Sequence, residues 1–234
     1  KYTDERSISY ANVALSDRIS QNPERFYLSG RQTWADLTVL FEELKAGYHP
    51  FFKEDTKIDI FAYSIGAFLS QIALMANQKG LYGDSRLFMF CGGSIFRSMS
   101  GISRSIMDKP AFETMQQYYI YHFGNEDTPV WEHDNAFNAF LQMITPERFR
   151  AERENIFSRL KGKIRGIALT KDTVIPYHGV LEALGEKNAQ STIQLLDFSF
   201  PYTHENPFPH NSTDITSLNN AFTTVFSRAA EFLA

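Results

Sequence analysis

The sequence predicts an α/β protein whose central sheet is mostly parallel. Short apolar stretches typical of buried strands alternate with helical patterns along most of the chain. Strands separated by helices are joined by crossover connections, which make the strands parallel and place helices on both faces of the sheet. The composition agrees with a globular protein, because 43% of the 234 residues are hydrophobic and 21% are charged.

The first part of the chain predicts one strand and one helix. Residues 11–16 form a short apolar stretch that we interpret as a strand, followed by a polar loop to residue 32. Thr33 and Asp36 have the spacing of a capping box, so we expect a helix to begin there. Gly47 is a suitable residue for the end of this helix.

The remaining core elements follow from short apolar runs and from helical periodicity. We expect four more strands and three helices, and the last helix has its apolar residues in helical register. The strands are residues 58–62, 87–91, 164–169 and 193–200; the helices are residues 65–77, 176–185 and 215–233.

Residues 94–161 interrupt this alternation. They contain no convincing strand but hold several helical patterns rich in Phe, Tyr and Met. A connection of this length between two adjacent strands exceeds an ordinary loop. We therefore expect a helical insertion, called the lid below, and a core made of residues 1–93 and 162–234.

A serine lies at the junction of a predicted strand and a predicted buried helix. Ser64 is flanked two residues away on each side by the small residues Ala62 and Gly66. Small residues at these positions permit a sharp strand-to-helix turn that presents the hydroxyl at its tip. The helix N-terminus also directs free N–H groups toward an anion. A structural serine in a tight turn is the alternative interpretation.

This segment resembles the nucleophile turn of the α/β-hydrolase superfamily, with Ala62 where most members have glycine. In motif order the resemblance covers residues 11–234, and it is closest to uncharacterised bacterial hydrolases that carry a helical lid. It implies a three-layer sandwich and a catalytic serine, acid and histidine in that order along the chain. The lid would be inserted before the strand that precedes the acid.

The resemblance identifies candidates for the other two catalytic residues. Asp172 follows the strand at residues 164–169, where the superfamily places its acid, although a turn-forming aspartate is the alternative. Asp197 lies within a predicted strand and is a poorer candidate. Two histidines follow the strand at residues 193–200; His204 lies closer to the strand end and is favoured, while His210 stays an alternative.

The resemblance also implies a site for the oxyanion that forms during acyl transfer. The backbone N–H of Ile65, the residue after the nucleophile, supplies one donor, and the second donor is unknown. The superfamily places three strands and a helix before the strand predicted at residues 11–16, and this chain has no counterpart of them. We expect an additional N-terminal segment or a separate chain to complete the sheet. A rearranged fold in which the loop at residues 17–30 supplies the donor is the alternative.

Several classes of partner and cofactor are not expected. The formal net charge of −4 excludes a basic surface for nucleic acid. The longest apolar stretch, residues 60–76, is broken by polar residues and is no membrane span. The single cysteine, Cys91, excludes an intrachain disulfide, and neither a metal-ligand spacing nor a nucleotide-binding motif is present, so we expect no metal and no cofactor. No signal-peptide pattern is visible, and a cytoplasmic location is expected.

Together these observations predict a serine hydrolase that cleaves an ester or related acyl bond through Ser64, Asp172 and His204. The aromatic residues of the lid favour an apolar acyl substrate. A non-catalytic small-molecule-binding protein that keeps the fold is one alternative. An acyltransferase, which passes the acyl group to an acceptor other than water, is another.

Overall fold

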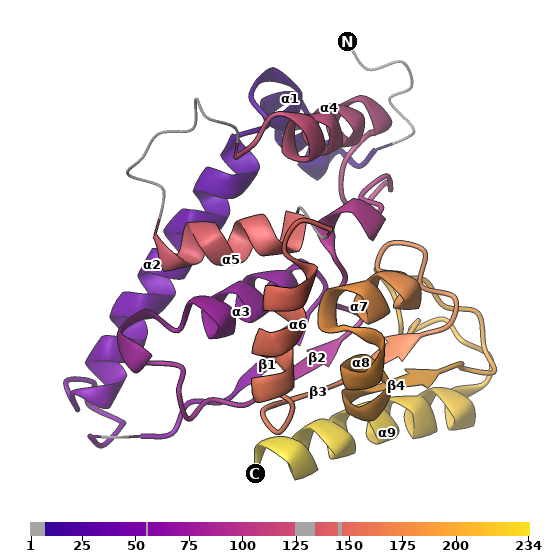
Figure 1. The fold of residues 1–234 in the computed structure, drawn as a ribbon. Coiled ribbons are helices and arrows are strands. Elements are labelled where there is room, and N and C mark those ends of the chain that lie inside the picture. The colour runs from indigo at the N-terminus through magenta and orange to yellow at the C-terminus, as the bar shows by residue number, and fades with distance from the viewer. Residues whose placement is uncertain (1–7, 55, 125–133, 145–146) are drawn as a thin grey trace.

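Four parallel strands form one sheet in the middle of the molecule (Figure 1). The computed structural model describes residues 8–54, 56–124, 134–144 and 147–234. Neighbouring strands are hydrogen-bonded in the order β1-β2-β3-β4, which is also their order in the chain. The strands are β1 (Ile60–Tyr63), β2 (Leu87–Phe90), β3 (Ile164–Leu169) and β4 (Ile193–Leu196).

Helices make up most of the rest of the described chain. Two of them precede the first strand, three lie between β2 and β3, and the longest of the C-terminal helices closes the chain. The α-helices are α1 (Tyr10–Gln21), α2 (Arg25–Lys45), α3 (Ile65–Ala76), α4 (Lys109–Tyr121), α5 (Asn135–Ile144), α6 (Arg150–Arg159), α7 (Tyr177–Leu184), α8 (Glu186–Thr192) and α9 (Ile215–Leu233), with short 3₁₀ turns at Gln78–Gly80 and Phe96–Ser98.

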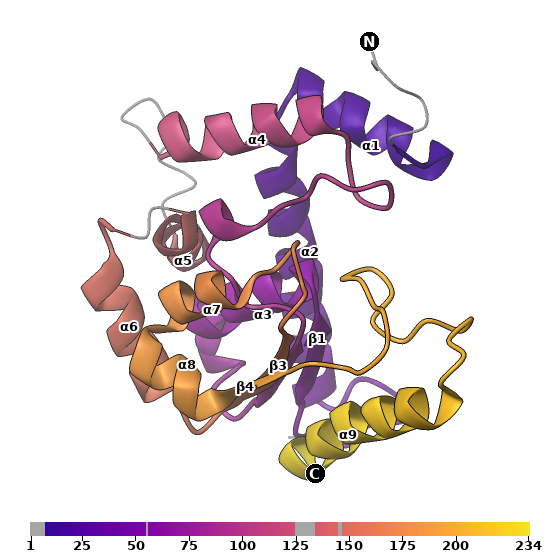
Figure 2. The same ribbon diagram turned by 90° about the vertical axis from the view of Figure 1, so that its right-hand side faces the viewer.

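Helices cover both faces of the sheet. Figure 2 shows the sheet nearly edge-on, with α9 on one side and α3, α7 and α8 on the other. Side chains of β2 alternate accordingly, because successive residues of a strand point to opposite faces. Leu87 and Met89 belong to the core cluster that includes α3, whereas Phe88 and Phe90 belong to the cluster that includes α9.

The α/β fold class predicted from the sequence is therefore confirmed. The strands expected at residues 58–62, 87–91 and 164–169 are present with small shifts of their ends, and the strand expected at residues 193–200 covers only Ile193–Leu196. The helix at residues 65–77 is confirmed as α3, whose first and last helical residues are Ile65 and Ala76.

The strand predicted at residues 11–16 is wrong, because these residues lie within helix α1. The buried side chains of α1 are Ser16 and Ile19, three residues apart, which is the spacing of one helix face. Ser16 Oγ accepts a hydrogen bond from the backbone N–H of Asp108, 3.0 Å away at the start of α4. Helices α1 and α4 thus lie side by side, as Figures 1 and 2 show.

The polar loop and the capping box predicted before residue 36 are also wrong. Helix α2 begins at Arg25, so Thr33 and Asp36 lie in its interior. Thr33 Oγ1 donates to the carbonyl of Ser29 one turn earlier, and Asp36 accepts from Gln32. The helix ends at Lys45, and Gly47 with φ 70° follows it, as predicted.

The described part of residues 94–161 is helical, as expected. It holds α4, α5 and α6, and its only strand-like feature is an isolated bridge between Ile102 and Met107. Helix α5 packs on α3 of the core, and α4 packs on α1. The division of the chain into core and lid stays a prediction.

The sheet has no gap in its middle, because the strand expected at residues 11–16 does not exist and β1 pairs directly with β2. Among the described residues, β1 is an edge strand with one paired side. No helix among the described residues is long and apolar enough to cross a membrane.

Candidate active site

Ser64 occupies the turn between β1 and α3 in an unusual backbone conformation. Its φ of 54° and ψ of −127° lie outside the regions that side-chain-bearing residues prefer. Such a conformation costs about 1–3 kcal/mol and persists only where the surrounding structure holds it. The strained turn ends the strand abruptly and directs the serine side chain away from the sheet. This is the turn that the sequence predicted.

The small residues around Ser64 fit this turn. Ala62 is 6% exposed within the core. At Gly66, in the first turn of α3, a Cβ would meet no atom within 4 Å. The space beside Gly66 is therefore open.

His204 joins Ser64 to a buried carboxylate. Its Nε2 lies 2.7 Å from Ser64 Oγ, and its Nδ1 lies 2.8 Å from Asp172 Oδ2. His204 and Asp172 are both 4% exposed, so water does not compete for the bond between them. Ser64 directly follows β1, whereas Asp172 and His204 lie in the segments after β3 and β4. The structure brings together the three residues that the sequence singled out.

The Asp172 carboxylate is held from both sides. Its Oδ1 accepts hydrogen bonds from the backbone N–H groups of Val174 (2.9 Å) and Ile175 (2.8 Å). Its Oδ2 is left for His204. This arrangement fixes the plane of the carboxylate, so that it receives a proton-bearing Nδ1 and leaves Nε2 free to accept a proton from Ser64.

The alternative residues lie elsewhere. His210 is exposed, whereas His204 is buried within hydrogen-bond distance of Ser64 Oγ. Asp197 forms a salt bridge with Lys171 (3.0 Å) and accepts a hydrogen bond from Tyr202. The geometry therefore selects His204 and Asp172 over the two rival positions.

Tyr63 is a part of the site that the sequence did not indicate. Its hydroxyl donates a hydrogen bond to the backbone carbonyl of His204. Its ring stacks on the imidazole, with centroids 5.4 Å apart and planes 16° from parallel. Its position directly before the serine is a sequence signal, but the contact depends on a loop 141 residues later in the chain.

Cys91 is buried at the end of β2 with a positive φ of 48°. Burial raises the pKa of its thiol well above the usual range, and the nearby Asp172 carboxylate raises it further. The thiol therefore stays protonated at neutral pH and is a poor nucleophile. Cys91 therefore acts as a small packing residue within the hydrophobic cluster around it.

The two sources expected for oxyanion donors are the backbone N–H of Ile65 and the segment at residues 17–30. Ile65 opens helix α3 directly after Ser64, and the first N–H groups of a helix lack partners within it. The loop expected at residues 17–30 consists mainly of the end of α1 and the start of α2. The predicted loop is therefore wrong, whereas a second oxyanion donor from residues 17–30 stays a prediction.

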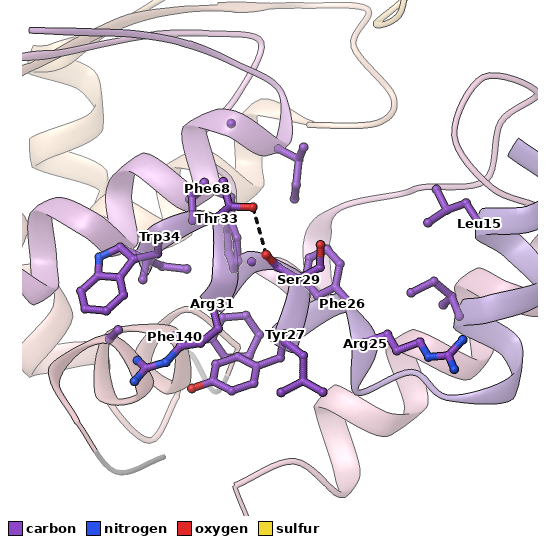
Figure 3. Close-up of a pocket in the computed structure, with 18 of the residues that line it drawn as sticks. Leu15, Arg25, Phe26, Tyr27, Ser29, Arg31, Thr33, Trp34, Phe68 and Phe140 are labelled. Atoms are coloured by element: carbon purple, nitrogen blue, oxygen red, sulfur yellow. Dashed lines mark hydrogen bonds between the residues drawn. The ribbon is translucent and has the colours of Figure 1, made fainter. Parts of the chain in front are cut away.

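A cavity of about 650 Å³ opens next to the serine turn (Figure 3). Ile65 and Gly66 line one end of it, and the rest is formed by residues of α1, α2, α3 and α5. Apolar side chains dominate the lining, with Phe26, Phe68 and Phe140 among them. Within the described ranges, no group of three or more His, Cys, Asp or Glu side chains is arranged to hold a metal ion.

Comparison with known proteins gives one match. The sequence model of a family described as one of unknown function matches residues 1–234. No curated protein and no solved structure matches the chain.

Proposed function

The chain belongs to the DUF6051 family, and we propose that it is a serine hydrolase of the α/β-hydrolase type that cleaves an ester or related acyl bond. The observation that carries this proposal is the unbroken hydrogen-bonded series from Ser64 through His204 to Asp172. A serine in a strained strand-to-helix turn, next to an imidazole that is oriented by a buried carboxylate, is the arrangement that activates a hydroxyl for attack.

The order of the residues supports the same fold assignment. Ser64, Asp172 and His204 follow β1, β3 and β4 in the order serine, acid and histidine, which is the order of the α/β hydrolases. Helices on both faces of the parallel sheet agree with a three-layer sandwich of this type. In this proposal α4, α5 and α6 form the lid over the core.

The chemistry follows from the positions of the three side chains. His204 Nε2 takes the proton of Ser64 as Oγ bonds to the substrate carbonyl carbon, and the Ile65 N–H donates to the oxygen that becomes negative. His204 then gives its proton to the leaving group as the bond to the acyl carbon breaks. Water then bonds to the acyl carbon with its proton going to His204, and His204 returns that proton to Ser64 Oγ as the bond between Oγ and the acyl carbon breaks and the carboxylic acid leaves. Asp172 stabilises the imidazolium in both steps.

Labelling with a fluorophosphonate tests the proposal, because only an activated serine reacts with this probe. We expect a single labelled peptide containing Ser64, and no label on a Ser64→Ala variant. Ser70→Ala is the matched control, because Ser70 lies on the same helix and its hydroxyl is bonded to the Gly66 carbonyl.

The outcome separates the proposed hydrolase from its alternatives. Absence of label on a folded wild-type protein would contradict it and favour a binding protein. A label on Ser64 together with acyl transfer to added alcohols or amines, without hydrolysis, would show that the protein is an acyltransferase and not a hydrolase.

A further inference from the structure

We infer that the cavity next to Ser64 binds the acyl chain of the substrate, and that this chain is apolar along its length and ends in an anionic group such as a carboxylate. The inference rests on the proposed function, because it places the acyl chain of the substrate on one side of Ser64 and the leaving group on the other. It goes further by naming the substrate class.

The position of the cavity assigns it to the acyl side. Its lining comes from residues 15–34, 65–72 and 136–140, and it includes Ile65 and Gly66. No lining residue comes from the loops that carry Asp172 and His204. The leaving group must lie beside His204, which protonates it. The acyl chain therefore extends in the other direction, along Ile65 and into the cavity.

The interior of the cavity suits an apolar chain. Ile19, Phe68, Ile72 and Phe140 line it and are each at most 6% exposed. The rings of Phe68 and Phe140 meet edge to face, with centroids 6.0 Å apart, and form a rigid wall. A volume of about 650 Å³ lies in the range of small-molecule pockets.

Two helical glycines keep the cavity open. Gly30 lies inside α2 and Gly66 in the first turn of α3; both line the cavity, and a Cβ at either would meet no atom within 4 Å. Glycine weakens a helix interior relative to alanine. No neighbouring atom in the described structure requires a glycine at position 30. A larger side chain there would occupy part of the open volume that Gly30 lines.

The charged residues of the lining are all cationic. Arg18, Arg25 and Arg31 line the cavity, and no carboxylate does. Arg31 is bound by Asp134 through both of its terminal nitrogens. Arg18 and Arg25 are exposed and form no salt bridge with any described residue. In Figure 3, Arg25 lies on the side of Leu15, whereas Arg31 lies on the side of Trp34.

Two guanidinium groups without a carboxylate partner complement an anion. A guanidinium binds a carboxylate through charge-assisted and often bidentate hydrogen bonds. With an apolar interior and two guanidinium groups in its lining, the cavity selects a chain that is mostly apolar and carries a negatively charged group.

Three p-nitrophenyl esters test the inference: the acetate, the octanoate and the monoester of suberic acid, which has the octanoate chain length with a terminal carboxylate. We expect kcat/KM to rise with each added methylene by up to about fourfold until the cavity is full. The suberate monoester should exceed the octanoate by about tenfold, because its carboxylate is bound by charge-assisted hydrogen bonds.

Variants assign these effects to the cavity. Gly30→Trp should lower kcat/KM for both eight-carbon esters at least tenfold while the acetate changes little, and Gly30→Ala is the matched control. The double variant Arg18→Gln, Arg25→Gln should abolish the preference for the suberate monoester, so that its kcat/KM falls to the value for the octanoate in the same variant. Equal rates for octanoate and suberate monoester in the wild type, or a Gly30→Trp variant that affects all three esters alike, would overturn the inference.

A binding measurement separates failure of the inference from failure of the proposed function. Calorimetric titration of the Ser64→Ala variant with monomethyl suberate and methyl octanoate needs no turnover, and the suberate ester should bind more tightly. Fluorophosphonate labelling of Ser64 without any discrimination between these ligands would retain the hydrolase and reject the cavity assignment. Selective binding without labelling would retain the cavity and reject the hydrolase.

Discussion

Gly92 lies directly against the backbone of Ser64. A Cβ at position 92 would be 3.0 Å from the Ser64 carbonyl oxygen and would overlap the Cβ of Ala67. The end of β2 therefore presses against the strained turn from behind and helps to hold the serine in its positive-φ conformation. Only glycine permits this approach without moving one of the two backbones.

The variant Gly92→Ala should be destabilised and less active, because either the turn or the end of β2 must shift. We expect a loss of about 1–3 kcal/mol, which for a chain of this size lowers the melting temperature by about 2–4 °C per kcal/mol. Gly162→Ala is the matched control, since its Cβ would meet nothing within 4 Å. Equal melting temperatures for the two variants would contradict the close approach.

Tyr63→Phe should reduce kcat without changing KM. The substitution keeps the ring that stacks on the imidazole and removes the hydroxyl that donates to the His204 carbonyl. One hydrogen bond of about 1 kcal/mol corresponds to roughly a fivefold loss in kcat if it positions the histidine. Tyr48→Phe, at an exposed position (82%), is the control for steady-state kinetics. A purely structural role of the hydroxyl would lower the melting temperature with kcat intact.

Asp172→Asn should reduce kcat by about 10³- to 10⁴-fold with little change in fold. The asparagine oxygen still accepts from Val174 and Ile175, so its NH₂ group faces His204 Nδ1. The imidazole is then forced into the tautomer with a proton on Nε2, which cannot accept the serine proton. Asp197→Asn, at the rival acid, should keep its activity in the same assay. A comparable loss in both variants would argue against the assignment of the acid.

The stability of the strand edge should depend on acid pH through Asp59. Burial raises the pKa of this carboxyl, but hydrogen bonds from Arg86 and Lys57 outweigh it and hold the pKa below its usual range. A lowered pKa in the folded state means that the stabilisation is present above the unfolded pKa of about 3.9. It is lost as the pH falls through the folded pKa.

Asp59→Asn should therefore cost about 1 kcal/mol at pH 7, as expected for a partly exposed ion pair. Urea unfolding of wild type and variant should give curves that approach one another as the pH falls from 7 through the lowered folded pKa of Asp59. A difference that is unchanged between pH 7 and pH 2 would show that the ion pair is not its cause.

The candidate site was predictable from the sequence because its signals are local. The strand before Ser64, the small residues around it and the apolar helix after it all lie within a few positions. Asp172 and His204 each follow a recognisable strand, so their place at one edge of a parallel sheet follows from the topology. The contact from Tyr63 to the His204 carbonyl was not predictable, because it depends on the path of an irregular loop.

The N-terminal helices were missed for a physical reason. Residues 11–16 form a short, mostly apolar stretch, and the helical spacing of Ser16 and Ile19 acquires meaning only when α4, some ninety residues later, packs against it. In α2, the capping-box spacing of Thr33 and Asp36 suggested a helix start. The structure shows instead that Gly30 leaves space for the cavity and that Thr33 bonds to the preceding turn.

The strained conformation of Ser64 destabilises the fold at the same residue that supplies the proposed nucleophile. With φ at 54°, the serine is held in a region that glycine adopts without penalty. Replacing it with glycine removes the nucleophile and also relieves the turn, so Ser64→Gly should be more stable than the wild type by about 1 kcal/mol. Random substitution selected only for thermal resistance would then favour loss of the hydroxyl. In the proposed hydrolase, the strain at Ser64 is therefore a destabilising feature that the catalytic role of its hydroxyl would explain.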